Sequence, residues 1–164
     1  MTAIFNDNVE CSQNHRWLTV LNEMIVPAKS LGGILLGEKF QVAVDRLGAH
    51  HVITRIDRGA VAIDDGAITI YHDPESGCIE SLACNKNFRA NFLGKLWPGM
   101  TVGDVLERTR TQLAWCGFVQ VDGIGGVGLS LPDEFDDFEQ LTDFLSREFV
   151  FNELWVYRFW KIIL

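Results

Sequence analysis

A glycine-rich run is the first segment whose residue types and spacing could do chemistry. The run Gly123-Ile-Gly125-Gly126-Val-Gly128 fits the GxGxxG spelling of loops that bind dinucleotides. In those loops a helix begins at the last glycine, and its N-terminus holds the pyrophosphate. Here the run is followed by Leu-Ser-Leu and Pro132, which cannot open such a helix. We therefore expect a flexible hairpin turn and no phosphate site.

The histidines and nucleophiles lack the spacing that a metal site or an active site requires. His50 and His51 are adjacent, so on a strand their rings point to opposite faces, and no HxH or HxxxH pattern occurs. No GxSxG elbow is present, and no cysteine stands in a recognisable reactive context. The sequence therefore predicts no metal, no cofactor and no catalytic residue, and we expect that the chain is not an enzyme.

The acidic charge is concentrated in one segment. The chain has 22 acidic and 14 basic Lys and Arg residues, a formal net charge of −8. Between positions 133 and 148 the only base is Arg147, and the acids are Asp133, Glu134, Asp136, Asp137, Glu139, Asp143 and Glu148. Such a field repels nucleic acid and steers a basic partner. Direct nucleic-acid binding is therefore disfavoured.

Length and composition favour a single folded domain over residues 1–164. Apolar residues make up 48% of the chain and charged residues 22%, which is typical of a packed globule. The N-terminus lacks the layout of a secretory signal, and the apolar stretches 31–36 and 155–164 are too short or too interrupted to span a bilayer. We expect a cytoplasmic protein that does not bind membranes. The cysteines are Cys11, Cys78, Cys84 and Cys116. We expect them to be reduced and mostly buried, with Cys116 in the core.

Apolar spacing and capping signals predict four helices. They cover residues 12–25, 39–47, 101–115 and 137–149. The third has Thr101 as its N-cap candidate and Asp104 in the capping position, and Gly117 follows it. The fourth carries acids on its polar face and in its first turn, where they match the helix dipole.

Alternating and β-branched residues predict an antiparallel meander between and after these helices. The expected strands cover residues 51–56, 60–63, 67–71, 78–84, 118–121, 127–131 and 153–163. Asp64-Asp65-Gly66 is a strong hairpin signal between two of them. The last strand is rich in aromatic residues, so it is either buried on both faces or paired to another chain. The predicted fold class is therefore α+β, with an antiparallel sheet packed against about four helices.

The order of a glycine, a short helix and strands occurs twice, which suggests two related halves over residues 31–84 and 93–131. Aligning Gly37 with Gly99 places Phe40, Val44 and Leu47 over Val102, Leu106 and Thr109. The acidic helix and the final strand complete the domain in residues 133–164. The motif Gly33-Ile-Leu-Leu-Gly37, repeated as Leu96-Trp-Pro-Gly99-Met-Thr-Val, resembles the tandem helix-plus-sheet repeats of small envelope and β-lactamase-inhibitor proteins. Those proteins are exported and this chain shows no export signal, so their function is not carried over.

In overall character the chain resembles bacterial immunity proteins, which bind and neutralise a cognate toxin domain. The resemblance rests on its small size, its acidity, the absence of a catalytic motif and the acidic cluster of residues 133–139. It implies a non-catalytic module whose acidic face covers a basic active site, such as that of a nuclease. The expected partner-binding residues are Asp133, Glu134, Asp136, Asp137, Glu139, Asp143, Trp155 and Tyr157.

Two other functions remain open. One is an enzyme that acts on a small molecule in a pocket lined by His51, His72 and the loop from Gly123 to Gly128. The other is a structural subunit that forms a homodimer by pairing its last strand with a copy of itself.

Overall fold

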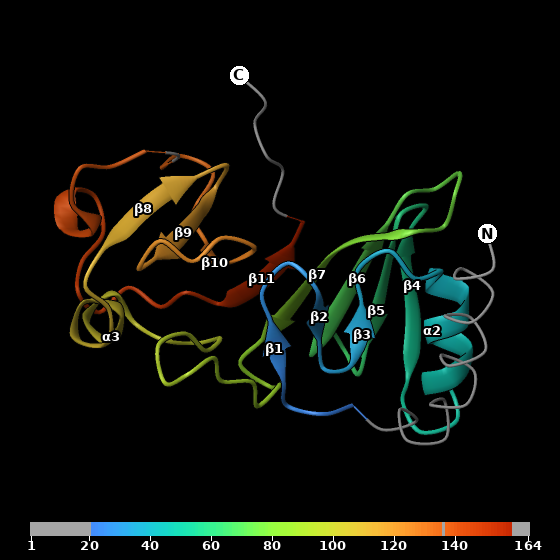
Figure 1. Cartoon of the computed structure of the whole chain (residues 1–164). Coiled ribbons are helices and arrows are strands. Elements are labelled where there is room, and N and C mark those ends of the chain that lie inside the picture. Colours follow the sequence, from blue (N-terminus) through green and yellow to red (C-terminus); the bar gives the residue numbers. More distant parts are fainter. Residues whose placement is uncertain (1–20, 136, 159–164) are drawn as a thin grey trace, which may run out of the picture.

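The computed structural model describes residues 21–135 and 137–158, and most of its regular structure is antiparallel sheet (Figure 1). Eight strands form one sheet in the order β4-β5-β6-β7-β11-β10-β9-β8. Their bounds are β4 Ile53–Asp57, β5 Ala60–Ile63, β6 Ile68–His72, β7 Ile79–Asn85, β8 Gln112–Trp115, β9 Phe118–Val121, β10 Val127–Ser130 and β11 Glu153–Tyr157. A second, three-stranded sheet consists of β1 Ile25–Val26, β2 Ser30–Leu31 and β3 Ile34–Leu35.

Helices are few in the described residues, so the prediction of an α+β fold with about four helices is wrong. The described ranges contain eleven strands, the helices α2 Phe40–Leu47 and α3 Val102–Arg108, and one 3-10 turn, η1 Leu141–Asp143. The helix predicted at residues 39–47 and the capping box of Thr101 with Asp104 are confirmed. The helix predicted at 12–25 lies outside the described residues up to position 20, and Ile25 belongs to β1.

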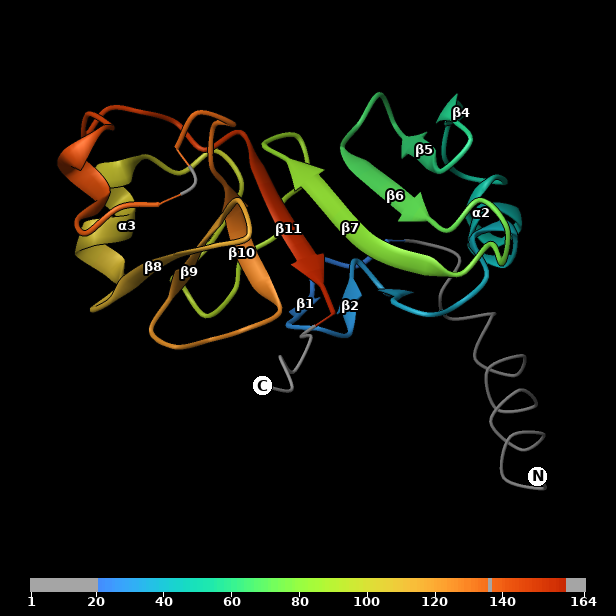
Figure 2. The ribbon, with the colours of Figure 1, turned by 90° about the horizontal axis from the view of Figure 1, so that it is seen from above.

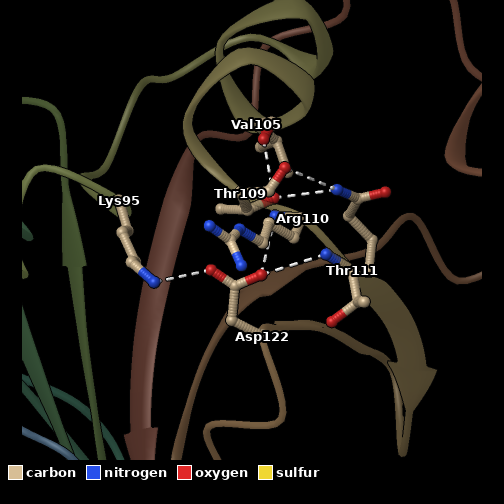
Figure 3. Close-up of polar contacts among 7 residues, drawn as sticks. Lys95, Val105, Thr109, Arg110, Thr111 and Asp122 are labelled. Atoms are coloured by element: carbon tan, nitrogen blue, oxygen red, sulfur yellow. Dashed lines mark hydrogen bonds and ion pairs between the residues drawn. The ribbon is translucent and has the colours of Figure 1, made fainter.

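The helix predicted at 101–115 stops at Arg108 because Asp122, in the turn after β9, captures the next backbone donors (Figure 3). Its Oδ1 accepts hydrogen bonds from the backbone N–H of Arg110 at 2.7 Å and of Thr111 at 3.0 Å. Thr109 is already extended, with φ −131°, and its hydroxyl donates to the carbonyl oxygen of Val105 at 2.7 Å. The chain therefore leaves the helix and enters β8 three residues later.

The prediction of a helix at 137–149 is wrong, because this segment is a loop with one 3-10 turn, and the last residues of the loop cap α3. The first N–H groups of a helix have no partner inside that helix. Here the N–H of Val102 donates to the carbonyl oxygen of Phe149, and the N–H of Gly103 donates to that of Arg147, both at 2.9 Å. The apolar spacing nevertheless predicts correctly which residues are buried, since Leu141 and Leu145 lie in the core.

The core lies on one face of the eight-stranded sheet. Ile70, Leu82 and Leu129 are fully buried there, in one cluster with residues of α2, α3 and the small sheet. Figure 2 shows α2 and α3 near opposite ends of the sheet. Because side chains alternate along a strand, the intervening residues point to the opposite face.

The sheet has an internal two-fold arrangement about the pair β7–β11. The register aligns Ala83 with Trp155, flanked symmetrically by Leu82 with Val156 and Cys84 with Leu154. Outward from this pair, β6, β5 and β4 on one side match β10, β9 and β8 on the other. In this arrangement β11 is the counterpart of β7, so the second copy of the pattern continues beyond residue 131.

Backbone hydrogen bonds repeat in the same way at the two glycines. The N–H of Gly37 donates to the carbonyl oxygen of Ile79, and the N–H of Gly99 donates to that of Phe151, both at 2.8 Å. Both glycines have positive φ, +87° and +89°, which an L side chain rarely adopts. Each glycine thus anchors the start of a helix to the strand segment that follows much later in the chain.

Asp64 and Asp122 make corresponding hydrogen bonds in the two halves. Asp64 and Asp122 both follow the second strand of their half, and both have φ +51°. The carboxylate of Asp64 accepts from the N–H of Val52 at 2.9 Å and contacts His51 Nδ1 at 2.7 Å. The carboxylate of Asp122 accepts from two N–H groups and from Lys95 Nζ at 2.6 Å. Each carboxylate therefore fixes the start of the facing edge strand.

We predict that Asp122→Asn lowers the free energy of unfolding at pH 7 by about 2 kcal/mol, because it weakens charged hydrogen bonds at a mostly buried group. The hydrogen bond from Lys95 lowers the pKa of Asp122 from the ordinary 3.8 to about 2. This stabilisation is complete above pH 3.8 and is lost as the pH falls through the folded-state value near 2. Urea unfolding at pH 7 and pH 2 should show the variant and the wild type converging at the lower pH.

The matched control is Asp65→Asn, in the turn after β5, whose exposed carboxylate has no hydrogen bond within the described ranges. It should unfold as the wild type does at both pH values. A loss of stability equal in the two variants would show that Asp122 has no special role.

Candidate functional site

The face of the large sheet opposite the core carries the candidate site. The helices and the small sheet contribute their buried side chains to the core cluster, on the other face. The open face receives the intervening residues of each strand, among them Glu153, Trp155 and Tyr157 of β11. A binding surface on this face would therefore be carried by rigid strands and not by loops.

Five aromatic side chains, hereafter the aromatic row, stack across the open face from β6 to β8. Their order is Tyr71, Trp155, Phe118, Tyr157 and Trp115, with successive ring centroids at 4.7, 5.6, 4.6 and 5.5 Å. Contacts of this kind contribute about 0.5–1.5 kcal/mol each beyond the burial of area. The row is therefore a stiff unit in which the rings hold one another in place.

Gly128 of β10 makes room for this packing. A Cβ atom there would lie 2.9 Å from Phe118 Cβ and 3.2 Å from Tyr157 Oη. The ring of Tyr157 can therefore cross β10 and reach Gln120, whose Nε2 donates to the tyrosine hydroxyl at 2.9 Å. Burial raises the pKa of Tyr157 to about 12.

The two-fold arrangement allows the aromatic row to be compared with the corresponding positions of the first half. Phe118 and Gln120 on β9 correspond to Ala60 and Ala62 on β5, and Trp155 corresponds to Ala83. At these three positions the first half carries small, buried residues where the second half carries larger ones, whereas Tyr71 of the first half belongs to the row itself. The strand pairing is the same around either set of side chains, so strand pairing alone does not determine where these rings lie.

A cleft of about 520 Å³ opens beside four members of the row, Trp115, Phe118, Trp155 and Tyr157. Its polar lining includes the carboxylates of Asp73 and Glu80, the base Arg158 and the thiols of Cys78 and Cys116. An apolar floor with a charged margin is typical of an interface core with its rim. Cys116 is exposed, contrary to prediction, because it occupies a left-handed position, φ +47°, in the turn between β8 and β9.

The structure separates the acidic segment from this cleft. Its acids lie in the loop after β10, which Figure 1 shows passing around the β8 end of the sheet, and none of them lines the cleft. The exposed ones are Asp133, Glu134, Asp137, Glu139, Asp143 and Glu148, whereas Asp136 lies outside the described residues. Within those residues none of these acids forms an ion pair. Only Trp155 and Tyr157, of the predicted partner-binding residues, belong to the cleft.

Sequence reasoning missed Trp115, Phe118, Asp73 and Glu80. Trp115 was assigned to the end of a helix, so its place opposite Phe118 on a paired strand could not be foreseen. For β9 the sequence does carry a signal of which side chains share a face. Phe118 and Gln120 alternate with the buried Val119 and Val121, so they lie together on the opposite face.

The residues of the alternative enzyme pocket do not meet. His51 Nδ1 contacts Asp64 at the turn after β5, whereas His72 is buried at the end of β6 with its ring stacked on Phe40 at 3.7 Å. The segment from Gly123 to Gly128 forms the turn between β9 and β10 and enters β10, as predicted, in the other half of the sheet. Nowhere in the ranges 21–135 and 137–158 do three or more His, Cys, Asp or Glu side chains form a group suited to a metal ion.

The geometry of β11 bears on the self-association hypothesis. Residues 153–157 pair with β7 on one edge and with β10 on the other, so this strand has no free edge for a second copy. The predicted residues 159–163 of the strand lie outside the described ranges.

The cysteines and helices add two further facts. Cys78, Cys84 and Cys116 are free thiols, and burial raises the pKa of Cys84 to about 12, which makes it a poor nucleophile. The longest helix in the described part of the chain, α2, has 8 residues, whereas a helix that crosses a bilayer needs about 20.

No family model, curated protein or solved structure matches this chain.

We predict that Tyr157→Phe lowers the free energy of unfolding by about 1–2 kcal/mol, because it leaves the buried Gln120 amide without its acceptor. Tyr71→Phe is the matched control, since the Tyr71 hydroxyl has no hydrogen bond to any described residue. Urea unfolding followed by tryptophan fluorescence measures both. Equal stabilities for the two variants would contradict the role given to the Tyr157 hydroxyl.

Proposed function

We propose that this chain is a non-catalytic protein-binding module that docks a basic partner protein on the aromatic row, in the manner of an immunity protein that neutralises a toxin domain. The observation that carries the proposal is the asymmetry of the open face. Phe118 and Trp155 of the second half stand where the first half has alanines, and Tyr71 is the one ring that the first half contributes to the aromatic row. Half-buried, preorganised aromatic side chains are the residues that most often dominate binding energy at protein interfaces.

Charge supports a basic partner. Asp73 and Glu80 stand at the cleft against the single base Arg158, and Glu153 lies on the same face. The net charge of −8 and the exposed acids of residues 133–148 extend the negative field beyond the cleft. A toxin whose active site binds phosphates would present the complementary basic surface, so docking would compete with its substrate.

The first test removes one ring from the aromatic row. Trp115 stands at the end of the row, where it stacks only on Tyr157, so Trp115→Ala should leave the other rings in place. Tagged wild-type chain should retain one basic protein from the native cells, and the affinity of that purified protein should fall at least about 30-fold in the variant, as for an interface hot spot. Titration calorimetry measures the loss.

The matched control is Leu93→Ala, which truncates a side chain that is 75% exposed and lies outside the cleft. It should bind as the wild type does. Retention of full affinity by Trp115→Ala, or an equal loss in both variants, would sink the docking proposal.

A second test concerns the acidic loop, which should act on the rate of encounter. We expect Glu139→Lys to slow association about threefold at low salt, with little change in dissociation, because Glu139 is exposed and outside the cleft. Asp45→Lys on α2, at the far end of the sheet, makes the same charge change and should slow association less. Stopped-flow measurements at 20 and 200 mM salt would reject steering if the two variants behaved alike.

A further inference from the structure

A second cleft, unused by the proposed docking surface, lies at the connector between β7 and α3. It encloses about 530 Å³ and shares no residue with the first cleft. The connector, residues 86–101, runs from β7 to α3 in Figure 1. The cleft is lined by the bases Lys86, Arg89 and Arg108, by the aromatic side chains of Phe88 and Trp97, and by one acid, Glu23.

In the described part of the chain the three bases of this basic cleft form no ion pair, and Glu23 is the one carboxylate among its lining residues. No carboxylate of residues 21–135 or 137–158 lies within 4 Å of the charged groups of Lys86, Arg89 or Arg108. Three of the 14 Lys and Arg residues thus gather at one cleft of a protein with 22 acids. Like charges brought together raise the free energy unless an anion offsets the repulsion.

The cleft is also preorganised. The guanidinium of Arg108 lies over the ring of Trp97, 5.8 Å from its centroid, which restrains the arginine while its edge N–H groups stay available. Phe88 packs against Gly32, where a Cβ atom would lie 3.2 Å from the ring tip. The backbone between Asn85 and Phe88 is closed by a hydrogen bond of 3.0 Å from the Phe88 N–H to the Asn85 carbonyl oxygen. A ligand would therefore meet one cation, Arg108, already held beside an aromatic ring, with the exposed Lys86 and Arg89 free to reach it.

From this geometry we propose that the basic cleft binds a phosphate-bearing small molecule. Arginine forks and a lysine ammonium are the side chains that best match several phosphate oxygens at once. The volume suits a ligand of nucleotide size, and Phe88 and Trp97 offer apolar surface for a ring attached to the phosphates. The proposal is independent of docking on the aromatic row, because the two sets of lining residues do not overlap.

The test titrates the full chain with sodium pyrophosphate, ADP and adenosine at 50 mM salt, followed by calorimetry and tryptophan fluorescence. Both diphosphates should bind with a Kd below about 1 mM, and adenosine should bind at least about tenfold more weakly. Tighter binding of ADP than of pyrophosphate identifies a nucleotide as the ligand source, and the reverse order identifies an inorganic phosphate chain. Raising the salt to 200 mM should weaken binding of both diphosphates.

The decisive variant is Lys86→Ala/Arg89→Ala, which should raise the Kd of the diphosphates at least about tenfold. Both side chains are exposed and carry like charges, so the melting temperature should stay the same or rise slightly. The matched control, Lys29→Ala/Arg58→Ala, removes two exposed bases outside the cleft and should bind as the wild type does. No diphosphate binding below about 1 mM, or equal loss in both double variants, would overturn the proposal.

Discussion

The antiparallel pairing of β7 with β11 is the constraint on which the rest of the structure depends. It joins the two halves of the large sheet through the register of Ala83 with Trp155. The same register sends Cys84 and Leu154 into the core and Trp155 to the open face, above a residue small enough to leave room for the indole. A slip of one residue would exchange the two faces of β11 and bury Trp155 while exposing Leu154 and Val156. Core and candidate site are therefore fixed by one set of backbone hydrogen bonds.

Around this pair the same two kinds of backbone contact occur once in each half. Gly37 and Gly99 tie the helix starts to the central strands, and Asp64 and Asp122 fix the edge strands through backbone N–H groups. These repeated contacts concern the backbone and leave the outward side chains of the open face free to differ. The positions of Phe118 and Trp155 are therefore not constrained by these repeated contacts, and the first half has alanines at the corresponding positions.

Sequence reasoning succeeded where structure is decided locally and failed where it is decided by distant partners. Apolar alternation found β5 and β9 with their observed bounds, and the capping box of Thr101 placed the start of α3. The end of α3 was missed because it depends on Asp122, which lies beyond two further strands. Helical spacing of the buried Leu141 and Leu145 predicts a helix over residues 137–149, but Gln140 is extended and the Asp143 carboxylate accepts from its N–H. For the same reason Trp155 and Tyr157 could be singled out as aromatic residues, but their assembly with Trp115 and Phe118 could not.

The position of the charges assigns different roles to the acids. At physiological ionic strength charges are screened over about 8 Å, so only nearby groups act on a docked partner. Asp73 and Glu80 line the cleft and would therefore contribute to the bound state, whereas the acids of residues 133–148 lie outside the cleft and would act on the encounter. The basic cleft, with Lys86, Arg89 and Arg108, repels a basic protein and so favours approach to the open face. An anion bound in that cleft would weaken this repulsion. The two sites would therefore be coupled only through charge and only over a short range.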